Sequence, residues 1–411
     1  MIAYHFPPEN AIGAARPFRF YKYLQRFGWT PVVVTASPQD PARKLENVHY
    51  VPDPFLAKHR STAWHAERAI RRLLVPGQNG MAWSRRVARF CESQLNRNIE
   101  GRVALYSTFP PLGTHLAALQ VVRRHPLCWV ADFRDPCFRD LYHSPGKKTV
   151  ARRLRISIGT QIEQKIIEEP TIVIANTDAA AEEWKARFPR AAGRIQVIWN
   201  GFDGSDNLAA PALPPHTRKV LIHTGTMYGG RHTGPVLPSL DRLIRTNRLA
   251  ADSIVLRFVG ATDEGSLLPI DTALSAERQG WLEVTRTTVP RHHAVQMARE
   301  ADGLFLVQPQ SLTQVPGKLY EYIGIGRPIL AFILRGSPIE DILQRCGVPN
   351  VCIYPEDTPD QVDQALLRFL QIPAGPWKAN EWFLQTFDAV EQTRVLCSSI
   401  DEALAWNSSE K

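Results

Sequence analysis

Short apolar runs, separated by turn residues and helical patterns, recur along this chain and constrain its fold more than any other feature. Each run is continuous instead of alternating with polar residues, which is typical of parallel strands covered by helices on both faces. The runs span residues 2–6, 30–35, 103–107, 128–133, 171–176, 195–199, 219–224, 254–259, 281–284, 303–307, 328–332 and 351–354. The sequence therefore predicts an α/β fold with parallel sheets.

A change in composition divides these runs into two sets. Residues 204–218 are rich in Ala and Pro, which is typical of a linker. The 411 residues are also too many for one ordinary core. We therefore expect two facing Rossmann-like, doubly wound domains at 1–203 and 219–385, with 204–218 between them. Ligands of such sheets bind beyond the carboxyl ends of the strands, here in an interdomain cleft.

The chain is basic, since 49 Lys and Arg outnumber 40 Asp and Glu by 9. No nucleic-acid-binding motif accompanies this surplus, so we expect no nucleic-acid partner. Two interpretations of the basic segments remain open: solvated helix faces, or a peripheral contact with anionic membrane lipid. The residues concerned are Arg68, Arg71, Arg72, Arg85, Arg86, Arg89, Lys147, Lys148, Arg152, Arg153 and Arg155.

Neither the apolar runs nor the cysteines indicate a membrane-spanning or secreted protein. No run approaches the roughly 20 apolar residues of a spanning helix, and the N-terminus lacks the pattern of a signal peptide. The six cysteines form no CxxC pair and lie beside no histidine cluster, so we expect no disulfide framework and no zinc site. These patterns predict a cytoplasmic protein, either free or peripheral at the inner face of the membrane.

Two strand-end segments of the first half carry residues suited to a ligand. The loop 9–15 opens a helix, where Gly13 would let an anion approach the backbone. Asp132, Arg134 and Asp135 end the run 128–133, and such charges are costly to bury without partners. They could form an internal Asp–Arg pair that holds the loop, or an acid and a base that orient an acceptor hydroxyl.

The second half has two comparable segments. Residues 223–231 contain Gly225 and Thr226, whose N–H groups could bind phosphate, and Arg231, whose guanidinium could do the same. A plain glycine-rich turn is the alternative. Lys318 and Glu321 lie three residues apart at the start of a predicted helix over 318–325. Lys318 could neutralise a phosphate and Glu321 could accept hydrogen bonds from a ribose diol, unless they form a simple surface pair.

Together these segments resemble the GT-B glycosyltransferases of family GT4, the group 1 glycosyltransferases, and within it a bacterial surface-polysaccharide branch. The resemblance extends over nearly the whole chain and depends on five segments in the same order. These are Phe6-Pro-Pro-Glu-Asn-Ala-Ile-Gly-Ala-Ala-Arg16, Ala131-Asp-Phe-Arg-Asp-Pro136, Ile198-Trp-Asn-Gly-Phe-Asp203, Gly225-Thr-Met-Tyr-Gly-Gly-Arg231 and Pro316-Gly-Lys-Leu-Tyr-Glu-Tyr-Ile-Gly-Ile-Gly-Arg-Pro328.

The resemblance implies a retaining hexosyl- or related transferase that uses a nucleotide-diphosphate sugar and a glycan or lipid-linked acceptor, with no bound metal or other cofactor. Its roles carry over residue by residue. Glu321 would bind the ribose, and Arg231, Lys318 and Gly13 would bind the diphosphate. Gly225 and Thr226 would also contact the donor, and its nucleotide base would lie near Gly260 and Val289. On the acceptor side, the residues would be Asp132, Arg134 and Asp135. The catalytic set would be Arg134, Asp135, Arg231 and Lys318. The final segment, 386–411, would be a helix that crosses back to the first domain.

Two positions depart from the family pattern. Many relatives carry Glu-x7-Glu, where this chain has Thr313 before Glu321, and many have His at the position of Arg134. Two alternatives therefore stay open. One is a GT-B-like protein that binds a nucleotide-sugar or glycan without catalysis, and the other is a UDP-sugar 2-epimerase of the same fold.

Overall fold

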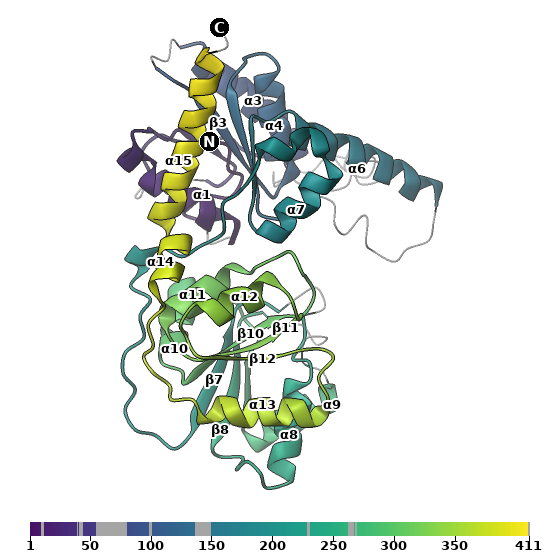
Figure 1. The fold of residues 1–411 in the computed structure, drawn as a ribbon, viewed down its shortest axis with the longest axis vertical. Helices are drawn as coiled ribbons and strands as arrows, with labels where there is room; N and C mark the ends of the chain where they lie inside the picture. The colour runs from purple at the N-terminus through teal and green to yellow at the C-terminus, as the bar shows by residue number, and fades with distance from the viewer. Residues whose placement is uncertain are drawn as a thin grey trace. The chain divides into compact units, whose positions relative to one another are not determined.

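A computed structural model of the chain describes residues 1–9, 12–38, 40, 44–54, 80–97, 101–135, 149–227, 231–261, 267 and 269–409. The chain divides into two compact units (Figure 1). Unit 1 comprises Met1–Asn200 and Ala389–Lys411, and unit 2 comprises Gly201–Asp388. Of the basic residues singled out above, Arg68, Arg71, Arg72, Lys147 and Lys148 lie outside the described residues.

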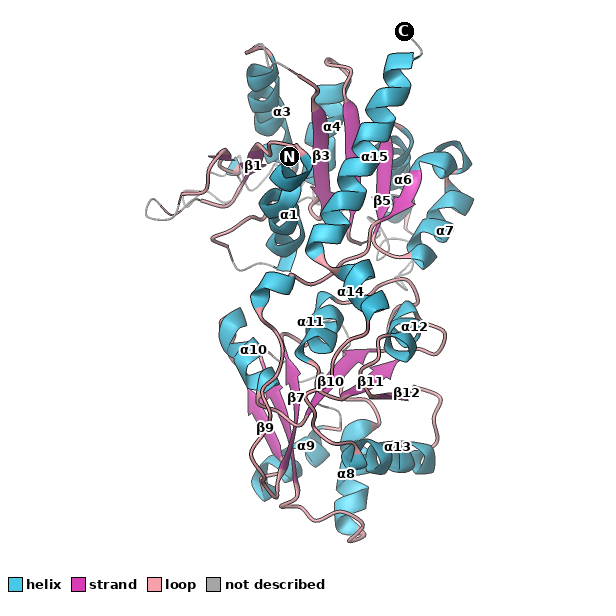
Figure 2. Cartoon of the chain, turned by 60° about the vertical axis from the view of Figure 1, so that its left-hand side comes forward, coloured by secondary structure: helices cyan, strands magenta, loops and turns pink. Residues whose placement is uncertain are grey.

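Unit 1 contains a parallel sheet whose strands, apart from β2, come from the apolar runs (Figure 2). Its strands are β1 (Val33–Thr35), β2 (Val48–Tyr50), β3 (Ala104–Phe109), β4 (Cys128–Phe133), β5 (Ile172–Ala175) and β6 (Ile195–Val197). Strand β2 pairs with β1, and β3 to β6 pair in chain order. Ile2 bridges β1 and β3 through Val34 and Ser107, so the first residues of the chain join the two parts.

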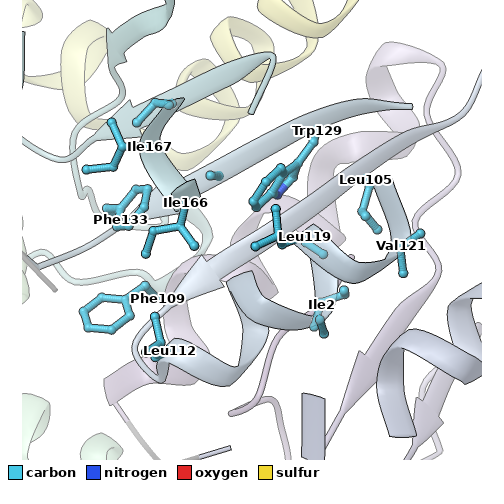
Figure 3. Close-up of a cluster of buried hydrophobic side chains, with 14 of the residues drawn as sticks. Ile2, Leu105, Phe109, Leu112, Leu119, Val121, Trp129, Phe133, Ile166 and Ile167 are labelled. Carbon is cyan, nitrogen blue, oxygen red and sulfur yellow. The ribbon is translucent and has the colours of Figure 1, made fainter. Parts of the chain in front are cut away.

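Helices cover both faces of this sheet, as the continuous apolar strands predict. Strand β4 shows how: Cys128 and Val130 pack with α1 and α15, whereas Trp129, Ala131 and Phe133 pack in a second core with α3, α4, α6 and α7 (Figure 3). The helices are α1 (Ile12–Tyr23), η1 (Leu24–Phe27), α3 (Met81–Leu95), α4 (Leu112–Val122), α6 (Val150–Glu168), α7 (Asp178–Arg187), η4 (Pro189–Arg194) and α15 (Ala389–Ser409). Helix α15 thus returns the end of the chain to unit 1.

Unit 2 has a six-stranded parallel sheet in the order β12-β11-β10-β7-β8-β9. Helices α8, α9 and α13 share one core with it, and α10, α11 and α12 lie on its other face (Figures 1 and 2). The strands are β7 (Lys219–Thr224), β8 (Ile254–Val259), β9 (Leu282–Thr285), β10 (Gly303–Gln308), β11 (Ile329–Ile333) and β12 (Asn350–Ile353). The helices are η5 (Gly204–Asp206), α8 (Val236–Arg245), α9 (Ile270–Gln279), α10 (Arg291–Arg299), α11 (Gly317–Ile325), α12 (Pro338–Arg345), α13 (Pro359–Gln371) and α14 (Glu381–Phe387).

The predicted α/β class with two Rossmann-like halves is confirmed, while some boundaries differ. Helix α1 begins at Ile12, inside the segment 9–15 that was predicted to be a loop. Pro17 lies inside this helix and has no N–H to donate to the carbonyl of Gly13, so α1 lacks that hydrogen bond. Strand β2 was not predicted, because its three residues, Val-His-Tyr, do not form an apolar run.

The Pro-rich stretch 204–218 is bound to unit 2 over much of its length. The N–H of Ala210 donates to the carbonyl of Ile325 (2.8 Å), and the buried guanidinium of Arg327 donates to the carbonyl of Pro211 (2.7 Å). His216 pairs with Asp302 (2.9 Å). These contacts make the stretch part of unit 2 instead of a free connector.

A buried ion pair joins helix α1 to the sheet of unit 1. Nε and Nη2 of Arg16 donate to both carboxylate oxygens of Asp132 at 2.9–3.1 Å, and both residues are almost fully buried. Arg16 also donates to the carbonyls of Ile198 (2.8 Å) and Trp199 (2.6 Å). Tyr106 donates to Asp132 as well (2.5 Å). One pair therefore links α1, β3, β4 and the end of β6.

We expect Asp132→Asn to lower the free energy of unfolding of unit 1 by about 3 kcal/mol or more, because it leaves the Arg16 guanidinium buried without its counter-charge. Urea denaturation followed by circular dichroism measures this. A matched control is Glu169→Gln, which breaks the exposed pair with Arg123 and should cost less than about 1 kcal/mol. Equal losses in the two variants would contradict the role given to the buried pair.

Candidate functional site

The order in which the chain adds strands to the sheet of unit 2 reverses between β7 and β10. The chain adds β8 and β9 on one side of β7, then returns to place β10, β11 and β12 on the other side. At such a switch point the loops beyond the carboxyl ends diverge and leave room for a ligand. Here β7 ends at Thr224, and the loop after β10 leads into α11.

Lys318 brings an ammonium group to this switch point. Its Nζ donates to the carbonyl of Thr224 (2.5 Å) and lies 3.1 Å from Nε2 of His223. Nδ1 of His223 lies 2.8 Å from the carbonyl of Phe305, which requires the proton on Nδ1 and leaves Nε2 to accept from Lys318. No carboxylate in the described part of the chain forms a salt bridge with Lys318. The cation is therefore held by neutral groups.

The surroundings of Lys318 disfavour its charge. Burial, together with the nearby charge of Arg231, lowers the pKa of Lys318 to about 7, and Glu321 only partly opposes them. Burial also lowers the pKa of His223 well below its ordinary value, with Lys318 adding to the effect, so this imidazole is neutral at pH 7. An anionic ligand would supply the negative charge that Lys318 does not receive from any described carboxylate.

Two glycines give access to this ammonium. Gly225 has φ +105° and a Cβ there would lie 2.8 Å from Nζ of Lys318. Gly260 has φ +139° and a Cβ there would lie 2.7 Å from the backbone of Gly225. Both positions thus require glycine. The prediction that the N–H of Gly225 binds phosphate is wrong, because it donates to the carbonyl of Val259 (2.7 Å); Thr226 is exposed.

Helix α11 places Glu321 one turn beyond Lys318. No side chain caps the N-terminus of this helix, whose first N–H groups attract an anion. Glu321 is paired with Arg291 (2.6 Å). Val289, which was predicted to lie near the nucleotide base, is half-buried and lies two residues before Arg291. Thr313 is half-buried in a turn where its N–H donates to Oγ of Ser311 (3.2 Å).

Unit 1 has its own switch point, between the Ile2 segment and β3. There the guanidinium of Arg134 donates to the carbonyls of Phe109 (3.0 Å) and Pro110 (2.9 Å), and no carboxylate of the described residues is within salt-bridge distance. A Cβ on Gly13 would lie 3.2 Å from both Nη atoms of Arg134 and 3.0 Å from the ring of His5. The structure thus brings together Gly13 and Arg134, which the sequence singled out separately.

The two aspartates that flank Arg134 differ. Asp132 is fully buried and accepts from Arg16, Tyr106 and Thr108, so the acceptor-side role predicted for it is wrong, and its role is structural. The internal Asp–Arg pair does exist, but its arginine is Arg16 and not Arg134. Asp135 is half-buried beyond the strand, and its charge counters the burial that lowers the pKa of Arg134.

Sequence reasoning missed three partners: Arg16, His223 and Arg291. Arg291 carried a usable signal, because a cation in the first turn of a helix opposes the helix dipole and so calls for an acidic partner. Arg16 and His223 lie 116 and 95 residues from Asp132 and Lys318, so no local pattern indicates these pairs.

Two kinds of feature are absent from the described residues. Within them, no group of three or more His, Cys, Asp or Glu is placed to hold a metal ion. Among the described helices, none has the length and apolar character needed to cross a membrane.

Comparisons with known proteins support the fold. The chain is similar to sucrose-phosphate synthase from Thermosynechococcus elongatus (14% identity, 100% of this chain and 97% of the other, TM-score 0.58). It is similar to the UDP-forming alpha,alpha-trehalose-phosphate synthase from Burkholderia vietnamiensis (12%, 98% and 98%, 0.60). It is also similar to WaaG, a glycosyltransferase involved in lipopolysaccharide biosynthesis (15%, 97% and 94%, 0.56).

These three structures are GT-B glycosyltransferases, and at 12% to 15% identity the likeness establishes the fold alone. Neither a protein-family model nor a curated protein sequence matches the chain.

The burial of Lys318 generates a prediction about stability. We expect Lys318→Met to unfold at a higher temperature than the unaltered protein at pH 7, because it removes a charge that burial disfavours. The pKa of Lys318 is about 7 when folded and 10.5 in its ordinary state. Between these values the unfolded chain binds the extra proton, so the gain is largest at and below pH 7 and shrinks as the pH rises toward 10.5.

Differential scanning calorimetry across this pH range measures the effect. The control is Lys219→Met in the same unit, since Lys219 also donates to main-chain carbonyls but lies at the opposite end of β7. A loss of stability in Lys318→Met at pH 7 would contradict the account.

Proposed function

We propose that this chain is a retaining glycosyltransferase that moves a hexose or related sugar from a nucleotide-diphosphate sugar to a glycan or lipid-linked acceptor in surface-polysaccharide assembly. One observation carries the proposal: Lys318, with Arg231 beside it, lies at the β7–β10 switch point without a carboxylate partner among the described residues. That arrangement suits a diphosphate. The GT-B fold and the GT4-like segments support the proposal that this diphosphate belongs to a nucleotide-sugar.

The donor would bind through unit 2. Its diphosphate would contact Lys318, Arg231 and the uncapped N-terminus of α11, with Gly225 giving it access. Glu321 would accept hydrogen bonds from the ribose diol. The base would lie near Gly260 and Val289, and Thr226 would line the donor pocket. In unit 1, Gly13 would also contact the diphosphate.

The chemical step requires charge to be stabilised on the departing phosphate. As the bond between the sugar and the diphosphate breaks, negative charge grows on the β-phosphate, and the cations of Lys318 and Arg231 would stabilise it. In retaining transfer without a protein nucleophile, the acceptor hydroxyl attacks from the face that the diphosphate leaves and gives its proton to the departing phosphate oxygen. In unit 1, Asp135 and Arg134 would orient that acceptor. No metal ion is part of this proposal.

The first experiment identifies which nucleotide the sugar donor carries. Thermal-shift measurements with UDP, GDP and ADP should show one nucleotide that stabilises the protein by mass action. The matching nucleotide-sugars are then assayed by mass spectrometry for transfer and for slow hydrolysis of the donor. Binding without turnover would favour the non-catalytic alternative, and release of an epimerised free sugar without acceptor would favour the epimerase.

With that donor, we expect Lys318→Met and Arg231→Ala each to lower turnover about 100-fold or more, because a preorganised charge on the leaving group is worth about 3 kcal/mol. Steady-state rates at saturating donor measure this. Lys219→Met is again the control and should keep full turnover. Near-full activity of either Lys318→Met or Arg231→Ala would exclude the assigned roles.

A peripheral membrane contact would suit a lipid-linked acceptor. Arg85, Arg86 and Arg89 are exposed along α3, and each basic residue near an anionic bilayer contributes about 1 kcal/mol. We expect co-sedimentation with vesicles of mixed neutral and anionic lipid, and a loss of about tenfold or more when all three become Gln. Unchanged sedimentation would leave these arginines as a solvated helix face.

A further inference from the structure

Arg291 occupies an unfavourable place for a cation and is held there by two acids. It is the first residue of α10, where the helix dipole repels positive charge. Its Nη2 donates to Asp206 (2.8 Å) and to Glu321 (2.6 Å). Burial works against the charge of Arg291, but Glu321 and Asp206 raise its pKa above the ordinary value. The position of Arg291 thus depends on these carboxylates.

The geometry of the pair leaves half of the Glu321 carboxylate available. Both Nε (2.8 Å) and Nη2 (2.6 Å) of Arg291 donate to the same oxygen, Oε1. Oε2 accepts no hydrogen bond from any described residue, and the Glu321 side chain is 28% exposed. The guanidinium therefore fixes the carboxylate without covering it, and Oε2 keeps its lone pairs for a hydroxyl donor.

Asp206 sets the balance of charge. Arg291 carries one positive charge, while Glu321 and Asp206 carry two negative ones, so the trio, named here the Arg291 triad, keeps a net negative charge. Because Asp206 shares Nη2, the fork of Arg291 does not close over both oxygens of Glu321. The triad suits neutral hydroxyl groups, in contrast to the cationic surroundings of Lys318 one helical turn away.

We propose that Arg291 is a positioning residue that prepares Glu321 to recognise the ribose hydroxyls of the nucleotide, with Asp206 holding Arg291 in place. This inference rests on the proposed function. A flexible carboxylate would lose side-chain entropy on binding a diol, whereas Arg291 imposes that order before the ligand arrives. Arg291 thereby contributes to the selection of ribose over deoxyribose without touching the reacting atoms.

The test compares nucleoside diphosphates with and without a ribose hydroxyl. UDP, GDP or ADP, whichever binds the unaltered protein best, is titrated by calorimetry beside its 2′-deoxy and 3′-deoxy forms. A hydrogen bond to a charged group predicts that at least one deoxy form binds about tenfold or more weakly. In Arg291→Ala this ratio should fall to about threefold or less, and Arg291→Lys should recover part of it.

The matched control is Arg286→Ala. Arg286 forms a pair with Glu277 of the same length, 2.6 Å, at an exposure of 57% against 54% for Arg291. This variant should keep the full ratio. Circular dichroism should show both variants folded, because ion pairs of partly exposed side chains such as these contribute little to stability.

Each other outcome overturns the inference. An unchanged ratio in Arg291→Ala, even with weaker binding of every nucleotide, would give Arg291 a merely structural role. Equal binding of ribose and deoxy forms by the unaltered protein would remove the role of Glu321. A failure of the proposed function is distinguishable, because then the unaltered protein binds none of the three nucleoside diphosphates.

Discussion

The site in unit 2 depends on an ammonium group that the fold holds with neutral partners. Lys318 contacts a main-chain carbonyl and the lone pair of His223, and the fold supplies no paired carboxylate among the described residues. Such a group is costly until an anion arrives. The parallel sheet makes this arrangement accessible, because its strand order reverses where Lys318 lies.

Unit 1 shows the contrasting use of the same chemistry. Arg16 is also buried, but Asp132 accepts from it with both oxygens, so the pair contributes to structure and offers a ligand nothing. Arg134, two residues beyond Asp132, donates to the carbonyls of Phe109 and Pro110 and forms no salt bridge with a carboxylate of the described residues. The two buried arginines of unit 1 thus differ in whether a carboxylate of the described residues pairs with them.

Much of the fold and part of the site could be predicted from the sequence, for a physical reason. Apolar runs indicate where parallel strands form, and ligands of such sheets bind at strand ends, so local pattern and resemblance single out Gly13, Gly225, Lys318 and Glu321 as candidates. Hydrogen-bond partners are set by tertiary contacts. The sequence could not show that the N–H of Gly225 donates to the carbonyl of Val259, or that Arg16 forms the ion pair with Asp132.

A crystal structure of the protein with its best-binding nucleotide-sugar tests the central claim most directly. The account predicts a diphosphate oxygen about 3 Å from Nζ of Lys318, beside Gly225 and Arg231. A nucleotide-sugar whose diphosphate lies elsewhere, with Nζ still bonded only to Thr224 and His223, would contradict it.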